Sequence, residues 1–500
     1  QGKVRRGSVA VYMDVSHPDV FEFLNLRVPT GDASRKCHSA GFHNAINISD
    51  SFMEAVEKDA DWDLVDPHDK GVRKTVSARK LWDQILDVRY RTGEPYLHFS
   101  DTSNRALPFA QKEIGLKINN TNLCSEIFLP NGPDRTFVCC LSSLNVEKFD
   151  EWKDTSLVRD LIRMLENVLE YFIKIAPSTI EKAKYSAMRE RALGLGVMGF
   201  HYYLQRNNVP FESQIARELN IKLFKHIHDE AIIATKELGI EKGECPDFIT
   251  DLTFTLYDGN KVVVKSSDYV GIVDPNNEFS SIPLNVRAFQ VVPGNTIIIN
   301  GYASRVEIIE GKHPHTGWRN ASLEAIAPTA NSAILCGTSP SIEPANSNAY
   351  VHQTRAGSWA VKNIYLEKLL VKKGLDTQEI WNEIISNKGS IQHMDIFSDD
   401  EKDVFKTSIE LNQMWVIRHA ADRQPFITQG QSVNLFFPPR CDRNYFSNVH
   451  REAWKRGLKS LYYVRTVTPN RADNVSQKLE RNALKSVEDD NSGDCMSCHG

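Results

Sequence analysis

Three chemically active side chains stand at alternate positions in the segment NTNLCSEIFLP: the amide of Asn122, the thiol of Cys124 and the carboxylate of Glu126. In an extended strand, side chains alternate between two faces, so this spacing predicts that the three groups share one wall. A small buried cysteine beside a surface acid would give the same pattern. Further residues must therefore decide between chemistry and packing.

A second pair of thiols follows about fifteen residues later, at Cys139 and Cys140 in FVCCLSSLN. The connection between them and Cys124 is long enough to fold back and bring one of these thiols near the first. Adjacent cysteines seldom bond each other, so we expect one of the two to face a core. Cys124 and one of the two adjacent cysteines could therefore lie close enough for redox chemistry.

Two more cysteines, Cys495 and Cys498, form a C-x-x-C spacing within the last six residues. On a flexible arm, this spacing suits a dithiol that shuttles reducing equivalents. Zinc is the alternative ligand for such a spacing, but a four-ligand site needs a second pair and the sequence has no other C-x-x-C. A redox dithiol is the favoured interpretation.

Small and hydroxyl residues gather in two other segments, Ala327–Ser332 and Gly337–Pro344. Exposed N–H groups with Ser and Thr hydroxyls can hold a phosphate without net positive charge, although a plain Ser/Thr loop has the same composition. Two adjacent tyrosines, Tyr462 and Tyr463, stand in the strand-like run LYYV. Such pairs ordinarily pack their rings in the protein and keep their hydroxyls in contact with water.

Hydrophobic periodicity predicts the elements that must position these groups. A run of Leu, Val and Phe at helical spacing predicts a helix over 157–172, capped within 154–156 and stopped by Pro177. A second helix is predicted from about Ser213 to Leu238, with Gly239 as its C-terminal stop. VAVYMDV, near the start, is typical of a strand. Long helices alternating with short apolar strands indicate an α/β fold.

The residue composition and the hydrophobic pattern change at two points along the chain. Between about 249 and 317 the runs FTLYDGNKVVV and FQVVPGNTIIINGYASRVEII predict a β-rich insert. From Thr468 onward apolar residues almost disappear, which is typical of a mobile tail. We therefore divide the chain at 1–249, 250–316, 317–467 and 468–500.

Composition restricts the class of protein. The 500 residues are 41% hydrophobic and 25% charged, which excludes collagen-like and mostly disordered chains. The 60 basic residues against 64 acidic ones give no field for a nucleic-acid backbone. There is no apolar run near the roughly 20 residues of a membrane span and no cleavable signal. Nine cysteines are too sparse for a secreted scaffold, so we expect the cytoplasm.

The glycines of Gly194–Gly199 spell a dinucleotide-binding fingerprint. However, the preceding SAMRERAL is helix-like rather than strand-like, and an acidic residue about 20 positions on is missing. We expect these glycines to permit close backbone packing. His226 and His228 lie two apart on a predicted helix and would point to different faces, so no metal site is expected.

Taken together, these segments resemble the large, catalytic subunit of class I ribonucleotide reductase, in a version similar to those of large tailed phages. The matching stretches occur in the family's order: NLCSEIFLP, CCLSSLN, RALGLGVMGFHYYL, RNASLEAIAPTANS, SIEP and SLYYVRT. The resemblance implies a ten-stranded α/β barrel of two antiparallel five-stranded halves. It also implies a central finger loop that carries a radical thiol, and an enzyme that reduces ribonucleoside diphosphates for DNA precursor synthesis.

The resemblance implies a role for each site residue. Cys124 would be the thiyl radical that abstracts the ribose 3′ hydrogen, Glu126 the base on the 3′ hydroxyl, and Asn122 a substrate-orienting amide. Cys139 would be one of two reducing thiols, with Cys140 a bystander. The diphosphate loop would comprise Pro328, Thr329, Ala330, Asn331 and Ser332. Tyr462 and Tyr463 would relay the radical, and Cys495 with Cys498 would re-reduce the active site.

The resemblance also implies partners. A di-iron small subunit would supply the radical, thioredoxin or glutaredoxin would reduce the tail, and nucleoside triphosphate effectors would bind a loop with Arg35 and Lys36 as contacts. The family's other reducing cysteine lies upstream of the stretch matched by QGKVRRGS. We therefore expect the C-terminal portion of a divided subunit, completed by a companion chain that carries the N-terminal part.

Two other functions fit the same resemblance. A catalytically silent assembly or regulatory subunit would keep the fold, but it would be expected to lose Asn122, Cys124 or Glu126, and all three are present. A cobalamin-dependent reductase of the same superfamily would not need the tyrosine pair. The sequence therefore favours the class I enzyme.

Overall fold

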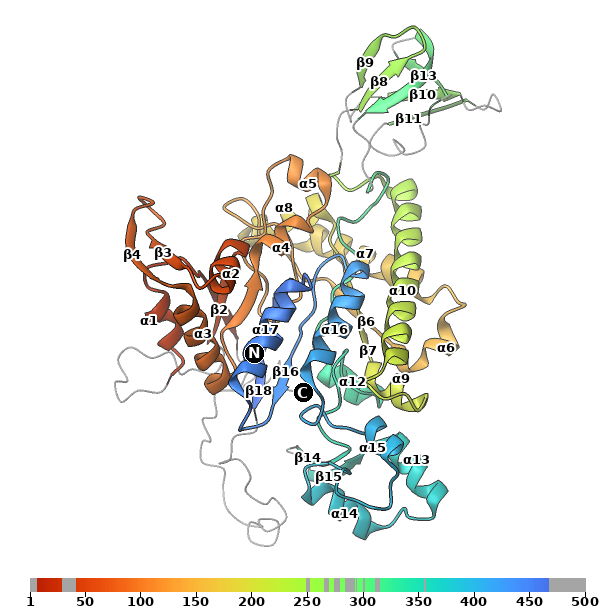
Figure 1. Ribbon diagram of the computed structural model, residues 1–500. Coiled ribbons are helices and arrows are strands. Elements are labelled where there is room, and N and C mark those ends of the chain that lie inside the picture. The colour runs from red at the N-terminus through yellow and green to blue at the C-terminus, as the bar shows by residue number, and fades with distance from the viewer. Residues whose placement is uncertain are drawn as a thin grey trace.

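The computed structural model describes residues 7–28, 42–248, 252–264, 269–273, 279–283, 293, 295–299, 302–310, 315–354 and 357–466 (Figure 1). The predicted effector contacts Arg35 and Lys36 and the predicted tail dithiol Cys495 and Cys498 lie outside these residues. Among the residues described, no helix is long and apolar enough to cross a membrane.

A four-stranded sheet forms the N-terminal part of the fold. Its strands are β1 (Val9–Asp14), β2 (Phe42–Ile48), β5 (Tyr96–Phe99) and β17 (Ser460–Leu461), in that order. The first three are parallel and β17 is antiparallel to β5. The predicted strand at VAVYMDV is confirmed as β1. Strand β17 comes from near the C-terminal end, so this sheet joins the two ends of the described chain.

Two further pairs of strands are parallel. Strand β6 (Leu141–Asn145) pairs with β7 (Gly194–Met198), and β16 (Leu435–Phe437) pairs with β18 (Val464–Thr466). Isolated parallel bridges join Leu195 to Glu324 and Ile326 to Gln431, so backbone pairing runs from β7 through 324–326 to 431. Together with the helices, these sheets confirm an α/β fold.

Strand β7 explains the glycines of the apparent dinucleotide fingerprint. A Cβ at Gly194 would lie 2.3 Å from Leu141 Cδ2, and a Cβ at Gly196 would lie 2.6 Å from the Ala325 carbonyl oxygen. Because real Cβ atoms do not approach so closely, only glycine lets β6, β7 and 322–327 pack together. The prediction of close backbone packing is confirmed.

Both long helices were predicted, with different ends. Helix α7 (Leu157–Ile175) begins after Ser156, as expected. Helix α10 (Gln214–Lys242) is capped by the Ser213 hydroxyl but continues past the predicted stop to Gly243. Gly239 lies inside α10. A Cβ at this position would lie only 2.1 Å from the Gly317 carbonyl oxygen, so the close contact requires glycine. The prediction of a C-terminal stop at Gly239 was wrong, since a long-range contact, not a turn, requires that glycine.

The segment 250–316 contains β8 (Leu252–Leu256), β9 (Lys261–Val264), β10 (Tyr269–Val273), β11 (Phe279–Pro283), β12 (Thr296–Ile299) and β13 (Tyr302–Glu310). They form one sheet in the order β11-β10-β12-β13-β8-β9, with each pair antiparallel. The FTLYDGNKVVV hairpin is β8–β9. This sheet lies apart from the other strands, at the top of Figure 1.

Helices and short strands complete the fold. The elements between residues 349 and 405 lie at the bottom of Figure 1 and share a separate apolar cluster, which includes Ala349, Leu366, Trp381 and Phe397. The remaining elements are α1 (Val20–Asn25), α2 (Asp50–Glu57), β3 (Asp61–Val65), β4 (Val72–Ser77), α3 (Ala78–Thr92), α4 (Ser100–Arg105), α5 (Phe109–Glu113), α6 (Phe149–Trp152), α8 (Glu181–Glu190), α9 (Phe200–Arg206), α12 (Ala330–Cys336), β14 (Ala349–Thr354), β15 (Gly357–Lys362), α13 (Ile364–Lys373), α14 (Gln378–Ser386), α15 (Asp399–Val404), α16 (Gln413–Arg423) and α17 (Arg443–Lys455).

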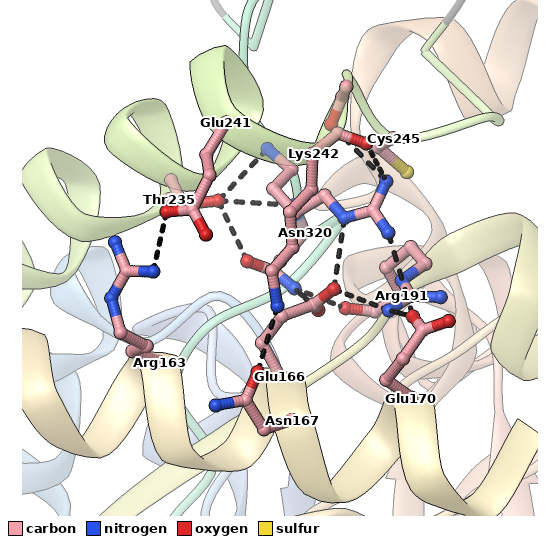
Figure 2. Close-up of polar contacts among 12 residues, drawn as sticks. Arg163, Glu166, Asn167, Glu170, Arg191, Thr235, Glu241, Lys242, Cys245 and Asn320 are labelled. Carbon is pink, nitrogen blue, oxygen red and sulfur yellow. Dashed lines mark hydrogen bonds and ion pairs between the residues drawn. The ribbon is translucent and has the colours of Figure 1, made fainter.

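A buried polar network ties α7 and α10 to the strands (Figure 2). Glu166, on α7, is fully buried and pairs with Arg191, which ends α8 in a left-handed conformation. Arg319 Nε donates at 2.9 Å to Glu166 Oε1, the oxygen that also pairs with Arg191, and Asn320 Nδ2 donates to Oε2 at 2.8 Å. Thr235, on α10, donates to Asn320 Oδ1 at 2.9 Å. One carboxylate therefore organises three segments.

Removing that carboxylate should be costly. We expect Glu166→Ala to lower the free energy of unfolding by about 3–5 kcal/mol, because it leaves the buried Arg191 without its main partner. The matched control is Glu170→Ala, one helical turn on: Glu170 also pairs with Arg191 but is 54% exposed, so about 1 kcal/mol or less is expected. Urea denaturation measures both. Equal effects would contradict the central role of Glu166.

Candidate functional site

The segment that carries Cys124 is a tight turn. The prediction that residues 122–126 form an extended strand was wrong: Leu123 and Cys124 lie in a turn, and Ser125 has φ of 60°, in the left-handed region. Asn122 builds this turn, because its carbonyl oxygen accepts from Ser125 N at 3.1 Å and its Oδ1 accepts from Glu126 N at 3.0 Å. A local side-chain bond has overridden the alternating pattern.

Hydrogen-bond donors from the C-terminal part of the chain hold the backbone carbonyl groups of the turn. Ser432 Oγ donates to the Cys124 carbonyl oxygen at 2.5 Å, and Ser460 Oγ donates to that of Ser125 at 3.0 Å. Gly430 N donates to the Glu126 carbonyl oxygen at 2.9 Å. The turn is therefore held by the 430–432 segment and by β17, both of which are more than 300 positions away along the chain.

Cys124 lies against the predicted tyrosine pair. Its half-buried side chain packs on a cluster of Ala45, Tyr96, Tyr462 and Tyr463. The Tyr462 and Tyr463 rings are 4.3 Å apart between centroids and tilted by 51°, and both are buried. The pair links β17 to β18, where the chain passes from one sheet to the other. The structure thus brings together the thiol and the tyrosines, which the sequence singled out separately.

Glu126 is buried beside this turn, with 1% of its surface exposed. Ser432 Oγ lies 3.3 Å from its Oε2, so one hydroxyl bridges the Cys124 backbone and the Glu126 carboxyl group. On the opposite side, Tyr12 Oη pairs with Thr121 Oγ1 and donates to the Asn122 carbonyl oxygen at 3.3 Å. Desolvation by burial, with a smaller contribution from the charge of Glu126, raises the pKa of Tyr12.

The two adjacent cysteines point to different surroundings. Cys140 is buried in the main core, where its Sγ donates to the Leu165 carbonyl oxygen at 3.5 Å, so the prediction that one of the pair faces a core is confirmed. Cys139 is exposed and lies beside the turn, with Asn122 Nδ2 donating to its Sγ at 3.9 Å. The connection therefore does fold back and place a second thiol next to Asn122.

The surroundings of Cys139 disfavour its thiolate. Although its side chain reaches solvent, desolvation by the surrounding protein and the charge of Glu126 raise the pKa of the thiol to about 12. Because the thiolate is the nucleophile, we expect iodoacetamide at pH 8 to label Cys139 at least about tenfold more slowly than the exposed Cys336, with the rate rising as the pH rises. Time-resolved peptide mass spectrometry measures this. Equal labelling of the two thiols would be inconsistent with the assigned surroundings.

The predicted phosphate loop lies at the start of α12. Pro328 and Thr329 precede the helix, and Ala330, Asn331 and Ser332 form its first turn. Thr329 Oγ1 accepts from Ser341 N at 2.8 Å, so the two small-residue segments are bonded together. Ile326 N donates to the Gly430 carbonyl oxygen, which links this loop to the same 430–432 segment that holds the Cys124 turn. Within the part of the chain that is described, no cluster of metal-ligating side chains occurs.

Residues that the sequence did not single out complete the surroundings of the tyrosines. Tyr96 contacts both rings of the pair, at centroid distances of 4.8 Å to Tyr462 and 5.0 Å to Tyr463. His43 Nδ1 lies 3.3 Å from Tyr463 Oη and 2.6 Å from Glu94 Oε1. These contacts join residues up to 420 positions apart, so no local pattern could have identified them.

Comparison with known proteins agrees with this geometry. Residues 1–464 match the family profile described as the ribonucleotide reductase barrel domain. The chain is 44% identical over 503 residues to a protein of Frog virus 3 (isolate Goorha) named as a ribonucleoside-diphosphate reductase large subunit, covering 100% of this chain and 76% of the relative. It is 34% identical over 559 residues to the ribonucleoside-diphosphate reductase large subunit of Invertebrate iridescent virus 3, covering 100% and 77%.

A solved structure extends the similarity to the fold. The class Id ribonucleotide reductase alpha subunit of Actinobacillus ureae superimposes with a TM-score of 0.71 at 32% sequence identity, over 93% of this chain and 71% of that one. The profile, the relatives and the superposition point to one family. The chain therefore belongs to the ribonucleotide reductase family and contains the barrel domain of its class I large subunit.

Proposed function

We propose that this chain carries the catalytic centre of a ribonucleoside-diphosphate reductase, which converts ribonucleoside diphosphates to deoxyribonucleoside diphosphates by thiyl-radical chemistry. The observation that carries the proposal is the packing of Cys124 against the Tyr462 and Tyr463 cluster, on a turn that also holds Asn122 and Glu126. The names of the relatives support the same reaction.

Cys124 is the proposed radical site. Its thiyl sulfur takes the 3′ hydrogen of the ribose, and Glu126 accepts the proton of the 3′ hydroxyl, which helps the 2′ hydroxyl to leave as water. Asn122 has a narrower role than the sequence suggested. Its Oδ1 accepts from the N–H groups of Glu126 and Ile127, and one Nδ2 hydrogen faces Cys139 Sγ, so the other Nδ2 hydrogen is the one assigned to orient a substrate.

The reduction also needs two electrons, which two thiols supply as they join in a disulfide. Cys139 is the proposed thiol on this chain, because it lies beside Asn122 and is protonated at neutral pH. Cys495 and Cys498 would then exchange with the disulfide and be reduced in turn by thioredoxin or glutaredoxin.

The remaining assignments concern partners. Tyr462 and Tyr463 relay the radical from a small subunit with a di-iron centre, and their ring contact supports this role. The substrate diphosphate is assigned to Pro328–Ser332, where Ala330, Asn331 and Ser332 form the first turn of α12. Nucleoside triphosphate effectors are assigned to a loop with Arg35 and Lys36, and this assignment rests on sequence resemblance alone.

The proposal includes the ten-stranded barrel, the domain boundaries at 249, 316 and 467 and the similarity to large tailed phages, all of which rest on the sequence resemblance. The alternative function is a catalytically silent assembly or regulatory subunit, which would keep the fold without turning over substrate.

One assay tests the proposal. The purified protein that carries this chain is combined with a radical-generating small subunit and a dithiol reductant, and reduction of a labelled ribonucleoside diphosphate is followed. We expect deoxyribonucleoside diphosphate to form only when the small subunit is present. A correctly assembled mixture without product would contradict the proposal and support the silent subunit instead.

A further inference from the structure

We propose that His43, held by Glu94, is a positioning residue for Tyr463 that donates a hydrogen bond to the tyrosine oxygen and stabilises its radical form. This inference rests on the proposed relay role of Tyr463. The three side chains come from three separate segments and are all buried, with 1%, 1% and 6% of their surfaces exposed for His43, Glu94 and Tyr463.

Glu94 fixes the imidazole. Its Oε1 lies 2.6 Å from His43 Nδ1, its Oε2 accepts from Asn44 N at 3.0 Å, and Arg27 Nε lies 3.3 Å from the same oxygen. Three donors thus converge on one carboxylate. Because a carboxylate oxygen only accepts, this network assigns the ring hydrogen of His43 to Nδ1.

The same hydrogen faces Tyr463. His43 Nδ1 is 3.3 Å from Tyr463 Oη, so its N–H is shared between Glu94 and the phenol oxygen as a three-centre bond. The opposite ring nitrogen, Nε2, is buried and has no hydrogen-bond partner in the described part of the chain. If Nε2 is an acceptor, leaving it without a partner costs less free energy than burying an N–H group that makes no hydrogen bond. The ring hydrogen is therefore assigned to Nδ1 rather than to Nε2.

Ring contacts hold this arrangement in place. The imidazole stacks on Tyr96 at 6.0 Å with an interplanar angle of 16°, and meets the Tyr463 ring edge-on at 6.0 Å. The guanidinium of Arg465 lies 5.0 Å from the Tyr463 ring centroid, over the face of the ring.

This geometry matters when the relay operates. In the proposed step the O–H bond of Tyr463 breaks and an O–H bond forms on an incoming oxygen-centred radical of the small subunit, so one hydrogen atom is transferred. The Tyr463 oxygen then accepts hydrogen bonds but no longer donates them. The His43 Nδ1–H can move toward it without giving up its own proton, which stabilises the tyrosyl radical relative to the phenol.

The test replaces Tyr463 with 3-aminotyrosine, which is oxidised more easily, so that its radical accumulates in the assembled enzyme. High-field EPR in D₂O then detects an exchangeable hydrogen bond to the radical oxygen, which lowers the largest g value. His43→Phe keeps the ring but removes the donor, whereas His43→Asn places an amide N–H near the position of Nδ1. In the Tyr463 enzyme, the same two variants are compared in turnover and in substrate binding.

We expect the parent radical to show the hydrogen bond, His43→Phe to lose it, and His43→Asn to restore it. Turnover should fall about tenfold in His43→Phe and recover in His43→Asn, as for one lost hydrogen bond, with substrate Kd unchanged. An unchanged spectrum in His43→Phe would overturn the inference while leaving the relay intact. No radical at position 463 in the parent would instead remove the relay itself, and this inference with it.

Discussion

Cys124→Ser is expected to abolish ribonucleoside-diphosphate reduction, with a loss on the order of 10⁴-fold or more. Serine is close to cysteine in size, and the Cys124 backbone carbonyl would still accept from Ser432, so the turn should keep its shape. The alcohol O–H bond is much stronger than a thiol S–H bond, so an oxygen at this position cannot host the radical. Labelled-substrate turnover measures the loss, and sedimentation of the complex verifies assembly.

A matched control separates this effect from general sensitivity to cysteine loss. Cys441 lies before α17, where its half-buried side chain donates from Sγ to the Asp442 carbonyl oxygen. Cys441→Ser should keep turnover within about twofold, as is typical of a surface substitution away from the site. If Cys124→Ser retained comparable activity, the radical could not reside on this sulfur.

Tyr462→Phe and Tyr463→Phe should each reduce turnover to background while substrate binding stays unchanged. Each removes one hydroxyl and keeps the ring, so the 4.3 Å ring contact and the packing with Tyr96 can persist. Phenylalanine has no phenolic hydrogen to give up, so it cannot pass a radical. Turnover and equilibrium dialysis with a ribonucleoside diphosphate measure the two properties separately.

Tyr257→Phe serves as the control for the tyrosine variants, because Tyr257 is 62% exposed and follows β8 in the six-stranded sheet. It should leave turnover unchanged. A loss of substrate affinity in Tyr462→Phe or Tyr463→Phe, with turnover of bound substrate preserved, would assign these rings to binding rather than to the relay.

The sequence predicts elements well where a signal is local. Helix α7 follows directly from apolar residues at helical spacing, and α10 from the same pattern behind Ser213. The end of α10 could not be predicted in this way. Gly239 looks like a stop, but it is required by the Gly317 carbonyl, which approaches from 78 positions along the chain. The preference of glycine for helix ends suggested a stop at Gly239, whereas the contact with Gly317 explains why glycine is needed there.

In the candidate site, too, the candidate residues could be named from the sequence, and the contacts that position them could not be predicted. The residue types at Asn122, Cys124 and Glu126 single out the segment that packs against the tyrosine pair, but their alternation suggested a strand. The Asn122 side chain instead bonds to N–H groups of its own turn, and Ser125 adopts a left-handed conformation that no period of two accommodates. The roles of His43, Glu94 and Ser432 depend on contacts between distant segments. The three-dimensional structure is needed to identify these contacts, because the segments that make them are far apart in the sequence.

A competition experiment with isotopically labelled substrate tests the central claim most directly, namely that a thiyl radical at Cys124 removes the ribose 3′ hydrogen. The assembled enzyme is given a mixture of unlabelled ribonucleoside diphosphate and the same substrate deuterated at the 3′ carbon, with a 4′-deuterated mixture as control. The account predicts that unreacted substrate becomes enriched in 3′ deuterium and not in 4′ deuterium. Enrichment at the 4′ carbon with none at the 3′ carbon would contradict it.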